Sequence, residues 1–106
     1  MAIFTGAGVA IVTPFNQADE SINYDKLDQL IDFHCNNGTD SIIVCGTTGE
    51  SATMTEEEHA ECVRFVIERT KGRVPVIAGT GSNCTKRAVE LSKDAAEHGA
   101  DGLLVV

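Results

Sequence analysis

The sequence predicts an α/β fold built around a parallel β-sheet. Four short apolar segments alternate with three helical patterns, and successive strand–helix units recur at intervals of about 30 residues, the size of one βαβ unit. The apolar segments are rich in Val and Ile at nearly every position and do not alternate with polar residues. Continuous apolar strands of this kind are typical of parallel sheets that are covered on both faces. The predicted order is therefore β-α-β-α-β-α-β.

The first unit begins with an apolar strand over residues 8–12. Pro14 ends this strand, because proline has no N–H group to donate to a neighbouring strand. A helix is predicted over Tyr24–Asn36, with Asn23 as its N-cap and Asn37-Gly38 as its left-handed stop. Helical spacing puts five residues of this helix on one face: Leu27, Leu30, Ile31, His34 and Cys35.

The second and third units repeat this plan. Residues 41–45 are predicted to form the second strand, and Thr55 with Glu58 gives the capping-box signature of a helix that runs to Thr70. A third strand over residues 74–78 is followed by a helix over residues 85–98, and residues 102–106 begin a fourth strand. The residues that these two helices are expected to bury are Ala60, Val63, Val66, Ile67, Ala88, Leu91 and Ala95.

Composition and charge argue against several classes of protein. The hydrophobic share is 42%, which suits a globular protein, and the formal net charge is -8. A chain this acidic is not expected to bind nucleic acid or an anionic membrane. No apolar run approaches the ~20 residues of a membrane span, and the N-terminus lacks a secretion signal. We therefore expect a cytoplasmic protein whose four cysteines are reduced thiols: Cys35, Cys45, Cys62 and Cys84.

Two architectures share this order of elements, the doubly wound sheet and the (β/α)8 barrel. Neither glycine-rich loop matches a dinucleotide-binding or P-loop fingerprint, because position 84 is cysteine where a third glycine is needed and Gly49 is not followed by Lys-Ser or Lys-Thr. Polar loops after several strands favour the barrel. A barrel takes about 250 residues, so we expect residues 1–106 to be the N-terminal half of a single barrel domain, truncated in or near its fourth strand.

The loop after the second strand is the strongest candidate for a ligand site. Thr47 and Thr48 lie between Gly46 and Gly49, at the carboxyl end of an apolar strand. Their hydroxyls and the nearby backbone N–H groups could bind a carboxylate, because glycine lets the backbone approach a ligand closely. Glu50 could orient the loop by accepting backbone N–H groups, or it could be a solvated acid. A plain turn, rich in turn-forming residues, is the alternative for the whole loop.

The loop over residues 79–83 is of the same kind. There we expect Asn83 to cap the third helix in preference to contacting a ligand. His34 is expected to be a packed core histidine, and His98 to lie at a helix end. His59 and Cys62 have zinc-ligand spacing but no second pair of ligands, so no metal site is expected.

The lysines also limit the chemistry of these residues. A lysine that forms a Schiff base needs a desolvated setting, such as an apolar strand, where its pKa falls. All four lysines instead lie in helices or at a helix end: Lys26, Lys71, Lys86 and Lys93. If the protein uses a Schiff-base lysine, we expect it outside these residues.

Several segments together are more specific than any single motif. They are FTG (4–6), VAIVTPF (9–15), GTTGESAT (46–53), His59 and VPVIAGTGSN (74–83). With them, nearly the whole chain resembles the N-terminal part of the dihydrodipicolinate synthase family, in the superfamily that also holds N-acetylneuraminate lyase. The resemblance implies a TIM barrel that condenses pyruvate with aspartate semialdehyde in lysine biosynthesis, through a Schiff base on a barrel lysine and without a cofactor.

The resemblance also implies roles for the first loop. Thr48 would hold the pyruvate carboxylate through its hydroxyl and N–H, and Thr47 would belong to a proton relay with two tyrosines, one of them from a neighbouring subunit. Gly46, Gly49 and Glu50 would support this loop. The shared tyrosine implies a homo-oligomer, either a tetramer or a dimer.

The other parts of that site have no counterpart in this sequence. The relay tyrosines, a carboxylate-binding arginine and the Schiff-base lysine would lie beyond Val106, and Tyr24 is not one of the relay tyrosines. We therefore expect the isolated chain to be inactive.

A regulatory site is the last feature that the resemblance implies. Lysine-inhibited relatives bind lysine at a subunit interface, at positions that would match Ser51, Ala52, His59 and Asn83. The glutamate that binds the lysine ammonium falls at Arg87 here. Since a cation facing a cation is unfavourable, we expect weak or absent inhibition by lysine.

Two other functions stay open at this point. One is a different pyruvate aldolase of the superfamily, such as an N-acetylneuraminate or 2-keto-3-deoxy sugar acid lyase. The other is a non-catalytic half barrel that self-associates, because four parallel strands leave two open sheet edges.

Overall fold

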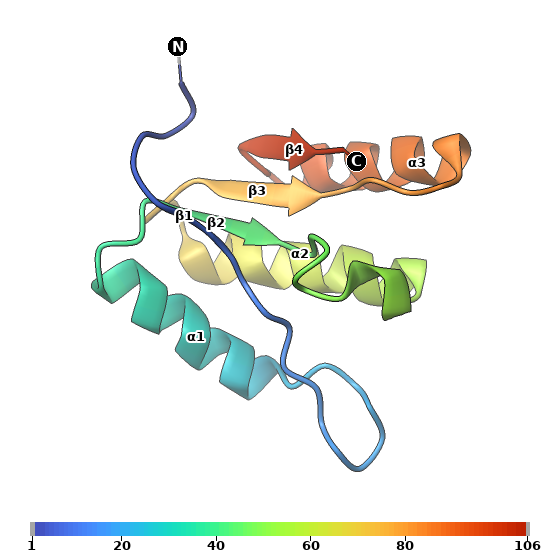
Figure 1. Ribbon diagram of the computed structural model, residues 1–106, viewed down its shortest axis with the longest axis horizontal. Helices are drawn as coiled ribbons and strands as arrows, with labels where there is room; N and C mark the ends of the chain where they lie inside the picture. The colour runs from blue at the N-terminus through green and yellow to red at the C-terminus, as the bar shows by residue number, and fades with distance from the viewer. Residues whose placement is uncertain (1, 106) are drawn as a thin grey trace.

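The structure is a computed structural model that describes residues 2–105. It contains one four-stranded parallel sheet, three α-helices and a short 3₁₀-helix (Figure 1). The elements follow the predicted order. They are β1 (Gly8–Ala10), α1 (Tyr24–Asn36), β2 (Ser41–Val44), η1 (Ser51–Thr53), α2 (Glu56–Thr70), β3 (Val76–Gly79), α3 (Thr85–Glu97) and β4 (Gly102–Leu104).

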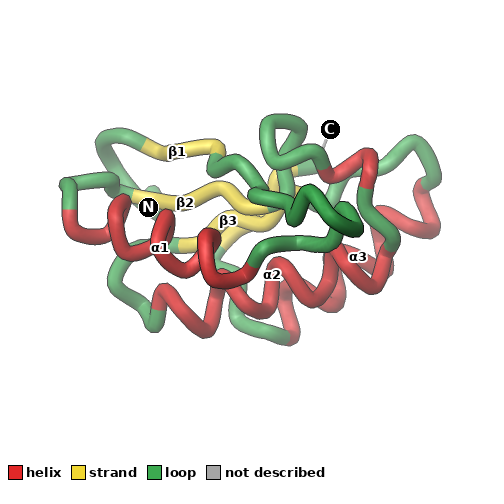
Figure 2. The backbone as a smooth tube through the Cα atoms, turned by 90° about the horizontal axis from the view of Figure 1, so that it is seen from below, coloured by secondary structure: helices red, strands yellow, loops and turns green. Residues whose placement is uncertain are grey.

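The arrangement of the strands separates the two candidate architectures. The sheet order is β1-β2-β3-β4, so every strand pairs with the next one along the chain. In a doubly wound sheet the order reverses at a switch point, and helices cover both faces. Here α1, α2 and α3 lie on the same side of the sheet (Figure 2), and neighbouring helices pack against one another. This is how part of a barrel wall is arranged, as predicted.

Within the described residues, helices cover one face of the sheet (Figure 2). Val44 and Ala78 are fully buried, while Ala10 is exposed and Ile77 is only half-buried. The physical reason is that an apolar strand in a barrel faces the helices with one set of side chains and the barrel interior with the other. Within residues 2–105 the interior face has no helix against it (Figure 2).

Two aspartates fix the register at the amino ends of the strands. The Asp40 carboxylate Oδ2 accepts a hydrogen bond from the Ala7 N–H at 2.8 Å, and the Asp40 N–H donates to the Ala7 carbonyl at 2.8 Å. Asp101 repeats this pair of bonds with Val76, at 2.9 Å and 2.8 Å. Each aspartate directly precedes one strand and joins it to the start of its neighbour. This shared device links β1 to β2 and β3 to β4.

The ends of α1 and α2 match the sequence signals. The Asn23 side chain accepts from the Lys26 N–H at 3.0 Å at the start of α1. At the start of α2, Thr55 and Glu58 form the predicted capping box, with bonds of 3.1 Å and 2.9 Å. Lys71, in the left-handed region at φ 50°, follows the last residue of α2. Local hydrogen bonding accounts for these boundaries.

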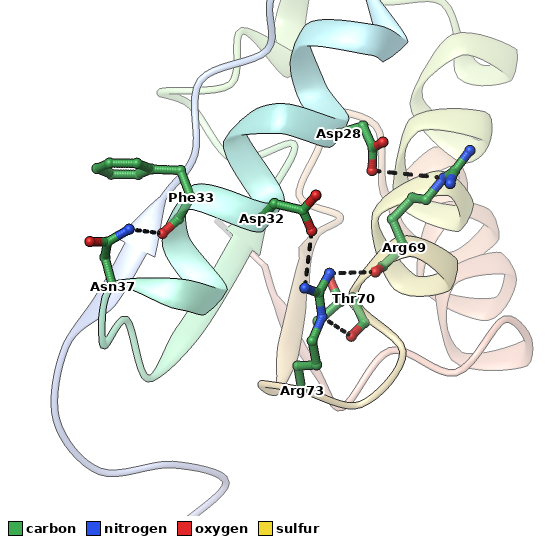
Figure 3. Close-up of polar contacts among 7 residues, drawn as sticks. All are labelled: Asp28, Asp32, Phe33, Asn37, Arg69, Thr70 and Arg73. Carbon is green, nitrogen blue, oxygen red and sulfur yellow. Dashed lines mark hydrogen bonds and ion pairs between the residues drawn. The ribbon is translucent and has the colours of Figure 1, made fainter.

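The outer surfaces of α1 and α2 are joined by ion pairs (Figure 3). Asp28 and Asp32 of α1 face Arg69 and Arg73, at nitrogen–oxygen distances of 3.9 Å and 3.0 Å. Arg73 also donates to the carbonyls of Arg69 and Thr70 at the end of α2. All four charged side chains are exposed by a third or more, so each pair contributes at most about 1 kcal/mol. The apolar core between the helices and the sheet contributes more.

That core holds most of the residues predicted to be inside. Leu27, Ile31, Val63, Val66, Leu91 and Ala95 are buried. Leu30, Cys35, Ala60, Ile67 and Ala88 are half-buried at its margin. His34 is also half-buried and bonds to the Thr39 hydroxyl at 3.2 Å, so it is not the packed core histidine that was expected. The cysteines divide in the same way, because Cys45 and Cys62 are buried while Cys84 is exposed.

The strands are shorter than predicted. β1 ends at Ala10, although the Ile11 N–H still donates to the Ile43 carbonyl at 3.1 Å. β3 begins two residues later than predicted, because Pro75 has no N–H and the ladder starts at Val76. β4 ends at Leu104, and Val106, the last residue of the predicted strand, lies outside the described residues.

Candidate functional site

The loops that follow β2 and β3 meet at the carboxyl end of the sheet. Between them lies a hollow of about 210 Å³. Its lining residues come from both loops and from the end of β4: Cys45, Gly46, Thr47, Ser51, Gly79, Gly81, Ser82, Asn83 and Leu104. In parallel α/β folds the carboxyl ends of the strands are where ligands bind. This hollow is the candidate site.

Thr47 and Thr48 lie on the turn that leaves β2. The turn closes with the Glu50 N–H donating to the Thr47 carbonyl at 3.0 Å. Both threonine side chains are exposed, and neither hydroxyl makes a hydrogen bond to another residue within 2–105. Thr47 lines the hollow, whereas Thr48 lies next to it on the same turn. Two free hydroxyls at the mouth of a buried strand are suited to accept or donate protons and to bind an anion.

Gly49 lies where a side chain would be crowded. A Cβ atom placed there would lie 3.1 Å from the Thr13 hydroxyl, 3.2 Å from the Ile11 carbonyl oxygen and 3.3 Å from the Cys45 nitrogen. The turn therefore packs directly on the segment after β1. The close approach at Gly49 is to the protein's own backbone and to Thr13, and the expected approach to a ligand stays a prediction.

Two roles were expected for Glu50, either an acid that accepts backbone N–H groups and orients the loop or a solvated acid. Its side chain is exposed, and its carboxylate accepts no hydrogen bond from residues 2–105. Its backbone has the left-handed φ of 60°, and its carbonyl accepts from the Thr53 hydroxyl at 2.8 Å. The solvated acid is therefore the interpretation that the structure favours. Glu50 supports the turn through its backbone.

Residues of α2 and α3 hold the second loop, residues 79–83, in place. His59 is buried, and its Nε2 lies 2.7 Å from the Gly79 carbonyl oxygen. Thr80 is fully buried and accepts from the Ser92 hydroxyl at 2.8 Å, while its N–H donates to the Leu104 carbonyl at 3.0 Å. These bonds fix the last residues of β3 at the edge of the hollow. Burial is the main cause that lowers the pKa of His59, and the positive charge of Arg87 lowers it further.

The prediction that Asn83 caps the third helix is wrong. The N-cap of α3 is Cys84, and no side chain accepts a hydrogen bond from the first turn. The Cys84 N–H donates instead to the Ser82 hydroxyl at 3.2 Å, so a local turn replaces the cap. The Asn83 side chain is exposed and lines the hollow together with Thr47.

A second cavity of about 460 Å³ lies beside the first. Its lining holds all four residues predicted for a regulatory site, Ser51, Ala52, His59 and Asn83, and it also includes Gly81, Ser82, Arg87 and Leu91. The Arg87 Nε lies 3.3 Å from a Glu56 carboxylate oxygen, and its Nη2 donates to the Met54 carbonyl at 3.4 Å. Arg87 therefore lies against this cavity with a fixed positive charge.

Some residues of the site were not predicted from the sequence. Leu104 lines the hollow because β4 pairs with β3, which places Leu104 opposite Gly79. Thr80 in the second loop and Ser92 in α3 lie twelve residues apart. No local sequence pattern indicates such contacts. The place of Leu104 can be inferred only once the order of the strands in the sheet is known.

Within residues 2–105, no group of three or more His, Cys, Asp or Glu residues could hold a metal ion. Lys26, Lys71, Lys86 and Lys93 are all exposed on helices or at a helix end. No helix in this range is long and apolar enough to cross a membrane.

The chain is similar to proteins of one known family over nearly its whole length. The model of the Dihydrodipicolinate synthetase family matches residues 3–106. The 4-hydroxy-tetrahydrodipicolinate synthase of Lachnoclostridium phytofermentans is 71% identical over 106 residues, which cover 100% of this chain and 36% of that protein. The chain thus spans about a third of the length of the curated relatives it matches.

Two solved structures extend the comparison. The crystal structure of dihydrodipicolinate synthase from Aquifex aeolicus is 53% identical, with a TM-score of 0.92 over 96% of this chain and 34% of that one. The chloride-inhibited dihydrodipicolinate synthase from Acinetobacter baumannii, complexed with pyruvate, is 42% identical, with a TM-score of 0.90 over 94% of this chain and 34% of that one.

Proposed function

The chain belongs to the dihydrodipicolinate synthetase family, and on that premise we propose that it forms the N-terminal third of a synthase that condenses pyruvate with aspartate semialdehyde. The product would be 4-hydroxy-tetrahydrodipicolinate, an intermediate of lysine biosynthesis. The enzyme would be a cytoplasmic homo-oligomer, a tetramer or a dimer, and it would need no cofactor.

The pair of free hydroxyls at the end of β2 is the observation that carries this proposal. Thr47 and Thr48 are exposed at the edge of the hollow and are not bonded to residues 2–105. In the proposed site the Thr48 hydroxyl and N–H hold the pyruvate carboxylate. This orients the keto carbon toward the attacking amine, and fixed orientation accounts for a large share of the rate in such reactions.

Thr47 has a separate role in the proposal. Imine formation joins the lysine nitrogen to the keto carbon and expels the keto oxygen as water, which requires protons to move to that oxygen. A hydroxyl both donates and accepts, so Thr47 can pass a proton along a chain of hydroxyls. The lysine is not among Lys26, Lys71, Lys86 and Lys93, because all four are exposed away from the hollow.

The four exposed lysines also support a second part of the proposal, that residues 1–106 alone are inactive. A chain without a suitable lysine cannot form the imine, so no condensation is expected in an assay of the isolated chain. Detectable condensation would contradict this.

Threonine variants of the complete protein that carries this chain test the proposed roles. Thr48→Ala removes a hydrogen bond to a charged carboxylate, worth about 1.5–3 kcal/mol, so KM for pyruvate is expected to rise about 10- to 100-fold. Thr47→Val keeps the shape but not the hydroxyl, so kcat is expected to fall about 100-fold or more. Thr53→Ala is the matched control, because its hydroxyl is already bonded to the Glu50 carbonyl. If Thr48→Ala and Thr53→Ala have the same KM for pyruvate, the proposed role of Thr48 is wrong.

The cavity beside the hollow is the proposed regulatory site. Ser51, Ala52, His59 and Asn83 would contact an effector there. Arg87 adds a positive charge, which opposes an ammonium group. We therefore propose that lysine inhibits this enzyme weakly or not at all.

Self-association of the isolated chain is the second candidate. Three apolar side chains in or next to the edge strands β1 and β4 are exposed: Val12, Leu103 and Val105, at 52%, 43% and 61%. Exposed apolar surface and unpaired strand edges favour association. A discrete dimer on a sizing column would support a half barrel that assembles, whereas a monomer would contradict it.

A further inference from the structure

A hydrogen bond between two hydroxyl groups joins α3 to the second loop. The Ser92 hydroxyl donates to Thr80 Oγ1 at 2.8 Å. Ser92 is half-buried on α3, and Thr80, which directly follows β3, is fully buried. Neither residue lines the hollow or the cavity beside it. The proposed chemistry therefore gives these two hydroxyls no direct contact with a substrate.

Packing alone does not explain the serine at position 92. Ala88 and Ala95 lie four residues before it and three residues after it, so all three share one side of α3. Alanine has a higher helix propensity than serine, whose hydroxyl competes for hydrogen bonds with the helix backbone. The Ser92 hydroxyl bonds instead to Thr80. The feature that distinguishes Ser92 from its alanine neighbours is thus its bond to the second loop.

Thr80 is fixed on two sides. Its side chain bonds to Ser92, and its N–H donates to the Leu104 carbonyl at 3.0 Å, one residue beyond the last pair of β3 and β4. The glycines on either side of it, Gly79 and Gly81, both line the hollow, whereas Thr80 does not. A glycine has no side chain that could anchor its own backbone. The anchor at Thr80 therefore helps to set where this wall of the hollow lies.

The end of β3 in turn supports the turn that carries Thr47 and Thr48, here called the threonine turn. A Cβ atom at Gly79 would lie 2.5 Å from the Cys45 carbonyl oxygen and 2.9 Å from the Gly46 Cα atom. The two backbones therefore touch, with no room for a side chain between them. A shift of Gly79 would be passed on directly to Cys45 and Gly46, the two residues that precede Thr47.

The burial of Thr80 makes its partner hard to replace. Thr80 is 0% exposed, so bulk water does not reach its hydroxyl. A buried hydroxyl that loses its partner either stays unsatisfied or moves toward another one. In both cases α3 no longer holds the second loop through this residue.

We propose that Ser92 is a positioning residue for the condensation, which acts through Thr80 to hold the second loop against the threonine turn. The inference rests on the proposed function, because it concerns pyruvate bound in the hollow. The hollow has a volume of only about 210 Å³. In so small a space a shift of the wall moves the bound substrate, and a misplacement of about 1 Å can lower the rate about 100-fold.

The test uses the complete protein that carries this chain, as Ser92→Ala, Thr80→Val and the double variant. Each single change removes one of the two hydroxyls and is expected to lower kcat/KM for pyruvate about tenfold. The double variant is expected to lose no more than the larger single loss, because after one change no bond is left to remove. Ser92→Thr keeps a hydroxyl and is expected to stay within about threefold of the original kcat/KM.

Thr39→Val is the matched control. The Thr39 hydroxyl bonds to His34 Nδ1 at 3.2 Å, so this variant also loses a part-buried hydroxyl bond. Thr39 lies before the amino end of β2 and does not line the hollow. The unfolding temperature is expected to fall in both Thr39→Val and Ser92→Ala, whereas kcat/KM falls in Ser92→Ala alone.

Two results would overturn this inference while leaving the proposed function intact. One is condensation with the same kcat/KM in Ser92→Ala as in Thr39→Val. The other is a double variant in which the two single losses multiply, since the two hydroxyls would then act separately. Absence of condensation by the original protein would overturn the proposed function, and the inference with it.

Discussion

The Nε2 atom of His59 lies 2.7 Å from the carbonyl oxygen of Gly79. A carbonyl can only accept, so Nε2 carries the proton, and the neutral imidazole donates to the last residue of β3. His59 is in the first turns of α2 and Gly79 is at the edge of the candidate site. This bond fixes the position of the second loop relative to the helix that packs beneath the threonine turn.

Removal of the imidazole should therefore loosen this edge of the site. His59→Leu fills the buried position with an apolar side chain but leaves the buried Gly79 carbonyl without its partner, which costs about 1–3 kcal/mol. We expect the free energy of unfolding to fall by that amount in urea titration. His98→Gln is the matched control, because His98 is exposed at the end of α3. Equal losses in the two variants would contradict the role of the buried bond.

The contribution of His59 should also depend on pH. Its pKa is lowered in the folded protein, mainly by burial, from the value of about 6.5 that it has when unfolded. Above this value both states are neutral and the stabilisation is fully present. As the pH falls below about 6.5, the unfolded chain takes up a proton that the folded chain does not, so stability is lost.

The direction of this pH dependence can be measured by comparing two proteins. The difference in free energy of unfolding between the original chain and His59→Leu is expected to be largest near pH 8 and to shrink toward about pH 5. The subtraction removes the titration of the carboxylates, which both proteins share. A difference that stays constant or grows as the pH falls would contradict the lowered pKa.

Glycine is required at position 79 because β3 lies very close to the end of β2 there. A Cβ atom at Gly79 would lie 2.5 Å from the Cys45 carbonyl oxygen, which belongs to the backbone and cannot move aside. Gly79→Ala is expected to lower the free energy of unfolding by about 1–3 kcal/mol. At Gly46, on the other side of the hollow, the nearest atom to an added Cβ is an Ile43 methyl at 3.7 Å. Gly46→Ala should therefore be tolerated, and equal costs for both variants would show that the close approach at Gly79 is not limiting.

Arg87 should decide the response of the proposed regulatory site. The complete protein is expected to keep its activity in lysine, because Arg87 presents a cation to the cavity. Arg87→Glu replaces it with a carboxylate that can bond to an ammonium group, so lysine inhibition is expected to strengthen at least about tenfold. Lys86→Glu makes the same change of charge on a neighbouring exposed residue that does not line the cavity. Strong inhibition of the original protein by lysine at physiological concentration would contradict this prediction.

The features that could be predicted from the sequence are those set by neighbouring residues. The Asn23 cap and the Thr55–Glu58 box are correct because each joins residues three positions apart. The parallel sheet also follows from local patterns, since apolar strands alternate with amphipathic helices. The Thr47–Thr48 turn could be identified for the same reason, as a polar loop at the end of an apolar strand.

The features that could not be predicted depend on contacts between distant residues. His59 and Gly79 are twenty residues apart, and only the packing of α2 on β3 brings them together. Asn83 has the residue type of a cap, but no side chain caps α3, and the Ser82 hydroxyl instead accepts from the Cys84 N–H in a local turn. The helix-free face of the sheet follows from barrel curvature, which no strand encodes alone.

We propose that the complete protein carrying this chain binds pyruvate as an imine on a lysine outside residues 1–106, with Thr48 holding the carboxylate. The most direct measurement is reduction of the protein with borohydride in the presence of pyruvate, followed by peptide mass spectrometry. We predict one trapped pyruvate, on a peptide outside these residues, and markedly less trapping in Thr48→Ala at the same pyruvate concentration. A protein that traps no pyruvate, or that traps it on Lys26, Lys71, Lys86 or Lys93, would contradict the account.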